Sequence, residues 1–187
     1  VEVVDLSEIL GGVARLSDDD PAVVERLDAV KAYLNTEAAP PAALVKIAKL
    51  SVVVDRWREA NKVDATAFQC WTSIQENLGI CSCTTMSMMS EALAPSACEV
   101  DVMGALAMYS MTLASGQPSA LLDWNNNYGD DPDRCVLFHC SNLPRSLLQD
   151  PAISVQDILA GTVGVDNTWG TCVGRIKPGP FTYARLS

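Results

Sequence analysis

Hydrophobic and polar positions follow helical periodicity over most of the first 60 residues. Before the first helix, the apolar stretch Val1–Val4 predicts a short strand. The clearest helix start is Asp20 followed by Pro21, because aspartate caps helix N-termini and proline is favoured in the first turn. With Asp5 or Ser7 as the cap of the first helix, the predicted helices cover residues 5–16, 20–34 and 40–59.

Between residues 63 and 114, short apolar stretches alternate with longer helical ones. Alternation of this kind predicts the α/β class, with helices packed on a parallel sheet. We therefore expect a Rossmann-like three-layer α/β/α domain over residues 1–116, in which residues 1–38 alternatively end a preceding domain. The predicted strands are 63–70 and 96–100, a loop covers 71–78, and the predicted helices are 79–92 and 102–114, the last capped by Asp101.

The pattern changes from Ser119 onward. Two apolar strands, 120–124 and 135–139, flank a polar turn, and short strands follow from Thr162. We therefore expect a domain boundary near Gly116, with residues 117–187 beginning a mostly antiparallel β domain. The chain lacks an initiator Met and both of its ends resemble interrupted strands, so we interpret it as a fragment of a longer protein.

Charge and cysteine usage narrow the function classes. The net charge of −10 would repel nucleic acid, so we expect no nucleic-acid partner. No signal segment and no apolar run near the ~18 residues of a membrane span occurs, which predicts a cytoplasmic protein without membrane contact. The seven cysteines are odd in number and lie mostly in apolar stretches, so we expect buried free thiols and no disulfide. Cys81 and Cys83 lack the paired Cys-x-x-Cys spacing of structural zinc sites.

Three acid–base or metal-binding side chains stand at strand ends. Glu99 ends the strand before the helix capped by Asp101, where ligands gather in open α/β sheets. Asp123 and His139 flank the polar turn, and in a hairpin centred on residue 131 they would face each other with Cβ atoms about 5 Å apart. That arrangement suits one metal ion. A solvated Glu99 and a structural core histidine at His139 remain the alternatives.

Neighbouring residues of the same cleft are candidates for substrate contact. The loop after the strand 63–70 contains Trp71 and Glu76, and Trp124 is adjacent to Asp123. We expect these three side chains to contact a substrate. For Glu76, a purely solvated position is an equal alternative.

Three segments share an order and spacing with a known family: Phe68-Gln69-Cys70-Trp71, Ala97–Leu106 (sequence ACEVDVMGAL) and Phe138–Pro144 (sequence FHCSNLP). Together they resemble the L-fucose isomerase-like branch of the fucose and arabinose isomerase family. The resemblance extends from about Ala43 to Ser187. It implies an aldose–ketose isomerase that acts on a monosaccharide with a divalent cation, typically Mn²⁺.

The resemblance also implies roles for the strand-end residues. Family members take one metal ligand from a Glu just before a helix and a second carboxylate some two dozen residues later; Glu99 and Asp123 are 24 positions apart. Arabinose isomerase-type members add a His roughly sixteen residues further, which fits His139. The implied metal ligands are therefore Glu99, Asp123 and His139, with Glu99 and Asp123 as the catalytic acid and base.

The resemblance further implies a homo-oligomer, usually a hexamer, and a last metal-binding His beyond Ser187. Because that ligand and the family's N-terminal domain are absent, we expect the 187 residues alone to be inactive. In the implied reaction one carboxylate removes a sugar proton to give a cis-enediol and the other returns it. The alternative is a non-catalytic sugar-binding or regulatory module, because an α/β fold alone does not fix function.

Overall fold

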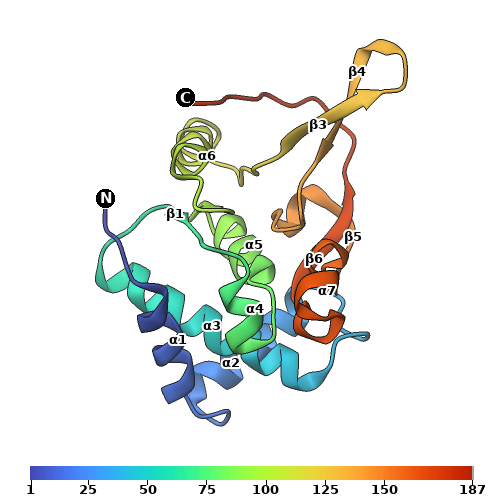
Figure 1. The fold of residues 1–187 in the computed structure, drawn as a ribbon. Coiled ribbons are helices and arrows are strands. Elements are labelled where there is room, and N and C mark those ends of the chain that lie inside the picture. The colour runs from blue at the N-terminus through green and yellow to red at the C-terminus, as the bar shows by residue number, and fades with distance from the viewer. Residues whose placement is uncertain (187) are drawn as a thin grey trace.

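The computed structural model describes residues 1–186, which form seven α-helices and three pairs of strands (Figure 1). The helices are α1 (Leu6–Arg15), α2 (Pro21–Tyr33), α3 (Pro41–Ala60), α4 (Ser73–Leu78), α5 (Cys83–Glu91), α6 (Val102–Ser115) and α7 (Asp157–Val163), with short 3-10 turns η1 (Arg145–Leu147) and η2 (Val165–Asn167). The strands are β1 (Thr66–Ala67), β2 (Ser96–Ala97), β3 (Asp123–Tyr128), β4 (Asp131–Phe138), β5 (Leu148–Ser154) and β6 (Thr171–Ile176).

Aspartate caps begin the helices where the sequence predicted them. The carboxylate of Asp20 accepts a hydrogen bond from the backbone N–H of Ala22, and Asp5 accepts one from Ser7. Asp101 caps α6 by accepting from the backbone N–H of Gly104 at 2.8 Å. These interactions satisfy helix N–H groups that have no partner within the helix. Within residues 1–186, no helix is both long and apolar enough to span a membrane.

The main apolar core joins α-helices to the later strands. Ile47 and Leu50 of α3 are fully buried in it, together with Met89 of α5. Ile153 of β5 and Cys172 of β6 belong to the same core, although they lie beyond the expected boundary near Gly116. Burying one such aliphatic side chain contributes roughly 1.5–3 kcal/mol, so this shared core holds the helical layer and the β5–β6 pair together.

Helix α5 passes through the centre of the molecule, and its buried hydroxyl groups bond to the segments around it (Figure 1). Ser87 Oγ donates to the carbonyl of Leu143 at 2.6 Å, and Thr85 Oγ1 pairs with Ser51 of α3 at 2.8 Å. Thr84 Oγ1 donates to the carbonyl of Gly170 at 2.8 Å. Small polar side chains therefore let α3, β6 and the segment after β4 approach α5 closely while satisfying the buried donors.

Gly170 is required where β6 meets α5. Its φ is +121°, and a Cβ atom there would collide with the carbonyl oxygen of Cys81. The neighbouring backbone is fixed by hydrogen bonds, because Cys81 N–H donates to Trp169 at 2.7 Å and Thr84 N–H donates to Gly170 at 2.8 Å. The missing side chain therefore allows the start of α5 to dock against the start of β6.

The fold is mixed α/β, and β1 and β2 pair in parallel as the alternating pattern predicted. The parallel pair is short, with Thr66 opposite Ser96 and Ala67 opposite Ala97, whereas the other two described pairs are antiparallel. The three-layer Rossmann-like arrangement stays a prediction. Three local predictions are wrong: Val1–Val4 and residues 180–186 are not strands, and residues 73–78 of the expected loop form α4. Apolar residues alone did not distinguish these short segments from strands and loops.

Strands β3 and β4 form the predicted antiparallel hairpin, which projects from the rest of the molecule (Figure 1). The register expected from the sequence is wrong by one position, because Asp123 lies opposite Phe138 rather than His139. β3 continues through the polar residues to Tyr128, whose partner is Asp131, so the turn contains only two residues. All of β3 is exposed, so polar side chains do not end the strand, and two irregularities in the pairing shift its register.

The segment after β6 crosses back over β3 toward α6 (Figure 1). The ring of Tyr183 lies edge-on to that of Trp124, with centroids 6.0 Å apart. Near its end, the guanidinium of Arg185 donates to the carboxylate of Asp101 at 2.6 Å. Asp101 therefore serves both as the cap of α6 and as the anchor of the C-terminal segment.

Candidate metal and thiol site

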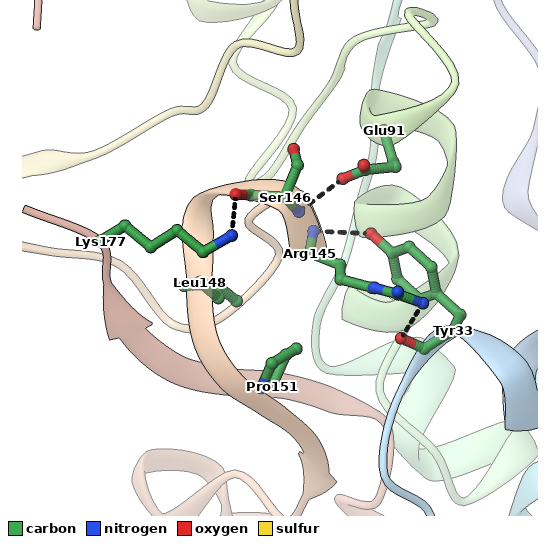
Figure 2. A pocket seen from close by; sticks show the side chains of 7 residues that line it. All are labelled: Tyr33, Glu91, Arg145, Ser146, Leu148, Pro151 and Lys177. Carbon is green, nitrogen blue, oxygen red and sulfur yellow. Dashed lines mark hydrogen bonds between the residues drawn. The ribbon is translucent and has the colours of Figure 1, made fainter. Parts of the chain in front are cut away.

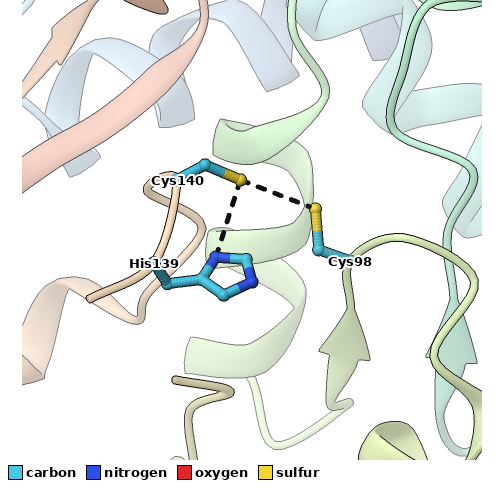
Figure 3. Close-up of side chains that lie close together, drawn as sticks. All are labelled: Cys98, His139 and Cys140. Atoms are coloured by element: carbon cyan, nitrogen blue, oxygen red, sulfur yellow. Dashed lines mark hydrogen bonds between the residues drawn. The ribbon is translucent and has the colours of Figure 1, made fainter. Parts of the chain in front are cut away.

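His139 directly follows β4 and is buried, with 6% of its surface exposed. Its ring nitrogen Nδ1 lies 3.7 Å from the sulfur of Cys140, the next residue (Figure 3). The imidazole of His139 is therefore buried directly after Phe138, the exposed last residue of β4. This position agrees with either a ligand or a structural histidine.

Glu99 lies just beyond the carboxyl end of β2, as its sequence position indicated. Hydrogen bonds from Phe68 N–H to Ala97 and from Val100 N–H to Phe68 hold this turn against β1. Glu99 and Val100 both have left-handed backbone conformations, with φ of 60° and 57°. Such conformations are unusual for residues other than glycine, cost of order 1–3 kcal/mol each and cluster at functional sites. The Glu99 carboxylate is exposed, whereas the preceding Cys98 is fully buried.

Asp123 begins β3, and its side chain is exposed. Burial by itself lowers the pKa of His139, but its contact with Cys140 and the negative charges of Asp123 and Glu99 raise that pKa above its ordinary value. Both carboxylates therefore act electrostatically on the same buried imidazole. This is an effect of charge alone, and the ligand set Glu99, Asp123 and His139 stays a prediction.

The groups nearest to His139 are thiols. Within residues 1–186, Cys98, His139 and Cys140 are the one set of three potential ligands whose donor atoms all lie within 4.8 Å of one another (Figure 3). Glu99, Asp123 and His139 do not form such a set. Cys98 and Cys140 were not among the ligands predicted from the sequence, although Cys98 precedes Glu99 and Cys140 follows His139.

Cys98 belongs to a larger cluster of buried thiols that also contains Cys70, Cys81 and Cys83, and the partly buried Cys140 packs against this cluster. The Cys98 sulfur lies 2.8 Å from that of Cys70 and 3.9 Å from that of Cys140. Thiol contacts from Cys83 and Cys98 lower the pKa of Cys140 far below its ordinary value, and nearby His139 adds to this effect. All seven cysteines of the chain are free thiols.

A groove of about 540 Å³ reaches His139 from the side of β4 and β6. Its walls include Leu122, Phe138 and Leu143, and Arg175 supplies a cationic group. Among the described residues that line it are none of the three expected substrate contacts. Trp71 and Trp124 are exposed by 49% and 64%, and Glu76 is exposed in the first turn of α4.

A second pocket, of about 480 Å³, lies between the end of α2 and η1 (Figure 2). Its polar groups bond to one another: Arg145 donates to the Tyr33 carbonyl at 3.1 Å, and Lys177 Nζ donates to the Ser146 carbonyl at 2.7 Å. The backbone N–H of Ser146 donates to Glu91 of α5 at 2.9 Å. These bonds tie α2, α5 and the segment after β6 to η1, which is a structural role.

The donor chemistry of the predicted ligands fits the expected cation. Two carboxylates and one imidazole suit Mn²⁺ or Mg²⁺ better than a thiolate-preferring ion. Glu99 and Asp123 are exposed, and their negative charges raise the pKa of His139. The thiols of Cys98 and Cys140 also lie close to this imidazole, and sulfur is a softer metal ligand than a carboxylate oxygen.

Part of this chain is similar to proteins that are named isomerases. The chain is 31% identical over 113 residues to sulfoquinovose isomerase of Clostridium sp. (strain MSTE9), covering 60% of this chain and 24% of that protein. It is 26% identical over 109 residues to sulfoquinovose isomerase of Alkalicoccus urumqiensis, covering 58% and 25%. With sulfoquinovose isomerase of Priestia megaterium it shares 25% identity over 97 residues, 52% and 22% of the two chains. No family model matches the chain. The chain thus spans about a quarter of the length of these relatives and is similar to isomerases over more than half of its own length.

Proposed function

We propose that this chain carries part of the active site of a metal-dependent aldose–ketose isomerase that acts on a monosaccharide. The observation that carries the proposal is position: Glu99 lies just beyond the end of β2, Asp123 begins β3, and buried His139 directly follows β4, the partner of β3. Similarity to three proteins named isomerases supports the same reaction class. A non-catalytic binding module would not need these three side chains to converge on one cation.

Glu99, Asp123 and His139 would hold a divalent cation, with Mn²⁺ the first choice for this donor set. Bound there, the cation supplies Lewis-acid chemistry, which lowers the pKa of the sugar proton to be removed. His139 orients this donor set because it is buried and cannot swing into solvent. The left-handed backbone at Glu99 fixes the direction from which its carboxylate approaches.

Glu99 and Asp123 would move the proton. One carboxylate removes it from the carbon beside the carbonyl, which leaves a cis-enediol, and the other donates a proton to the neighbouring carbon. Steps of this kind typically contribute about 10²–10⁴-fold to the rate. Both carboxylates are exposed, so a substrate can reach them.

Trp71, Glu76 and Trp124 are the proposed substrate contacts, and their side chains are accessible. Aromatic faces suit the apolar face of a sugar ring, and a carboxylate accepts hydrogen bonds from its hydroxyls. We also propose a homo-oligomer, hexameric as the family resemblance implies. Exposed aromatic groups on the hairpin and the following tail, Phe138 and Phe181 among them, support association.

The test is proton exchange. The longest natural polypeptide that contains these 187 residues is incubated in deuterium oxide with Mn²⁺ and a panel of L-fucose, D-arabinose and sulfoquinovose. Mass spectrometry of the recovered sugars then measures deuterium at the carbon beside the carbonyl. We expect incorporation into at least one sugar of the panel, and only with a divalent cation present. Sugar binding without exchange, with or without the cation, would instead support a binding module.

A further inference from the structure

We propose that Cys98, Cys140 and His139 form a binding site for a thiolate-preferring divalent cation such as Zn²⁺. Its donor set shares His139 with the carboxylate set, but binding of a cation by these thiols does not require the proposed isomerase function. Two thiols and an imidazole are typical zinc donors. The three side chains come from the end of β2 and the end of β4, so two ordered elements position them.

The distances agree with a tetrahedral centre. Zinc–sulfur bonds of about 2.3 Å and zinc–nitrogen bonds of about 2.0–2.1 Å place neighbouring sulfurs about 3.8 Å apart and a sulfur and a nitrogen about 3.5 Å apart. The Cys98 and Cys140 sulfurs are 3.9 Å apart, and the Cys140 sulfur is 3.7 Å from His139 Nδ1. All three donor atoms lie within 4.8 Å of one another, so a shift of about 1 Å brings the remaining pair, Cys98 and His139, to the separation of two ligands on one ion.

A fourth protein ligand is within reach. The Cys70 sulfur lies 2.8 Å from that of Cys98, within the same cluster. A shift of about 1 Å would bring it to the separation of two thiolates on one zinc ion. Without that shift, the fourth position is open to water.

The surroundings favour an ion over a purely apolar contact. Gln75 donates to the Cys70 carbonyl at 2.9 Å and to the Cys81 sulfur at 3.3 Å, which holds the polar side of the cluster in place. Its own Oε1 and the Ser82 hydroxyl are buried without a hydrogen-bond partner. Buried polar atoms next to several thiols are costly unless a ligand or water engages them.

Binding is balanced by proton release. Each thiol binds the cation as a thiolate, so its proton passes to solvent while the sulfur–metal bond forms, and no oxidant is needed. The imidazole binds through a neutral nitrogen.

The test uses Co²⁺ as a spectroscopic probe of the reduced, metal-free protein under anaerobic conditions. Thiolate ligation produces a sulfur-to-cobalt charge-transfer absorption in the near ultraviolet, and Zn²⁺ should abolish it by displacement. Cys98→Ser and Cys140→Ser should each weaken Co²⁺ binding on the order of tenfold or more, since even supporting residues of metal sites contribute 10–100-fold. Cys172→Ser, which removes an equally buried thiol outside the cluster, is the matched control and should retain the absorption.

Two further measurements separate this proposal from the isomerase proposal and from a failure of the variants to fold. Glu99→Gln should retain the charge-transfer absorption, so that failure of the isomerase proposal leaves this result unchanged. If a cysteine variant fails to fold, alkylation of the wild-type chain replaces it: Zn²⁺ should protect Cys98 and Cys140, mapped by mass spectrometry. Absence of the absorption in the wild type, its persistence in both cluster variants, or unprotected Cys98 and Cys140 overturns the proposal.

Discussion

The phenol oxygen of Tyr33 in α2 lies 2.8 Å from the hydroxyl oxygen of Ser87 in α5. Because Ser87 donates onward to Leu143, the phenol is the donor of this pair. Tyr33 also accepts a hydrogen bond from the backbone N–H of Arg145 at 2.8 Å. One hydroxyl group therefore joins α2, α5 and the segment after β4.

This relationship predicts an alkaline titration. Burial raises the pKa of Tyr33 well above its ordinary value, so the folded protein favours the neutral phenol. The corresponding stability is complete below the unfolded pKa of about 10 and is lost as pH rises toward the folded value. Between about pH 9 and pH 11, tyrosinate absorbance should rise equally in the wild type and in Tyr33→Phe. A rise smaller by about a quarter in the variant, one of four tyrosines, would contradict the prediction, provided both remain folded by circular dichroism.

Two glycines predict opposite changes in stability. Gly170→Ala should lower the free energy of unfolding by more than about 1 kcal/mol, because the new Cβ meets the Cys81 carbonyl at a positive φ. Gly161→Ala, in exposed α7 with open space around it, should raise stability by about 0.5–1 kcal/mol. Denaturant unfolding measures both. Equal effects of the two variants would show that the contact between β6 and α5 is not close.

The cysteines predict a simple thiol count. Titration of the denatured, unreduced chain should find all seven thiols free, in agreement with their state in the structure. In the native protein, the half-exposed Cys135 of β4 should react faster than buried Cys98. Five or fewer thiols in the denatured chain would mean that a disulfide forms, and Cys70 with Cys98 would be the first pair to examine.

Replacing either proposed catalytic carboxylate should reduce the exchange of the sugar proton with deuterium. Glu99→Gln and Asp123→Asn should each reduce deuterium incorporation at least 10²-fold, because each removes a proton-transfer group. Asp130→Asn is the matched control, since it removes an exposed carboxylate from the turn of the same hairpin and should leave exchange unchanged. The assay is the deuterium-exchange measurement proposed above. Undiminished exchange in either site variant would remove that residue from the mechanism.

The two proposals together predict inhibition by zinc. His139 belongs to both donor sets, so Zn²⁺ held by Cys98 and Cys140 would withdraw it from the carboxylates. Zn²⁺ should therefore suppress Mn²⁺-dependent exchange in the wild type. A Cys140→Ser variant should require at least tenfold more Zn²⁺ for the same suppression. Equal sensitivity of both proteins would indicate that zinc acts elsewhere.

The sequence predicted helix starts correctly, because these depend on residues close together in the chain. Asp20 with Pro21 and Asp101 marked helix starts correctly, because a cap bonds within two or three positions. The hairpin register was wrong by one position, since irregular pairing depends on the whole ladder. Glu99 could be placed at a strand end from the sequence, but its left-handed backbone depends on the hydrogen bonds that join Val100 to Phe68.

Local sequence patterns did not predict the thiol cluster. Cys98 and Cys140 carry no metal-site spacing, and they meet only because β2 and β4 end at the same place. One sequence feature could have indicated the cluster: Cys98 directly precedes Glu99, and Cys140 directly follows His139. Two cysteines that each flank a proposed ligand predict that the ligands and the thiols share one neighbourhood.

The long sequence separations within the cluster bear on how the chain folds. Cys70 and Cys98 are 28 positions apart, and Cys98 and Cys140 are 42 apart. Contacts between distant segments require loop closure and slow the search for the native state, so this cluster should assemble late. A cation that needs both ends of the 42-residue loop binds the finished molecule and not its precursors. A bound cation would therefore slow unfolding of the native protein and leave the rate of the first folding steps unchanged.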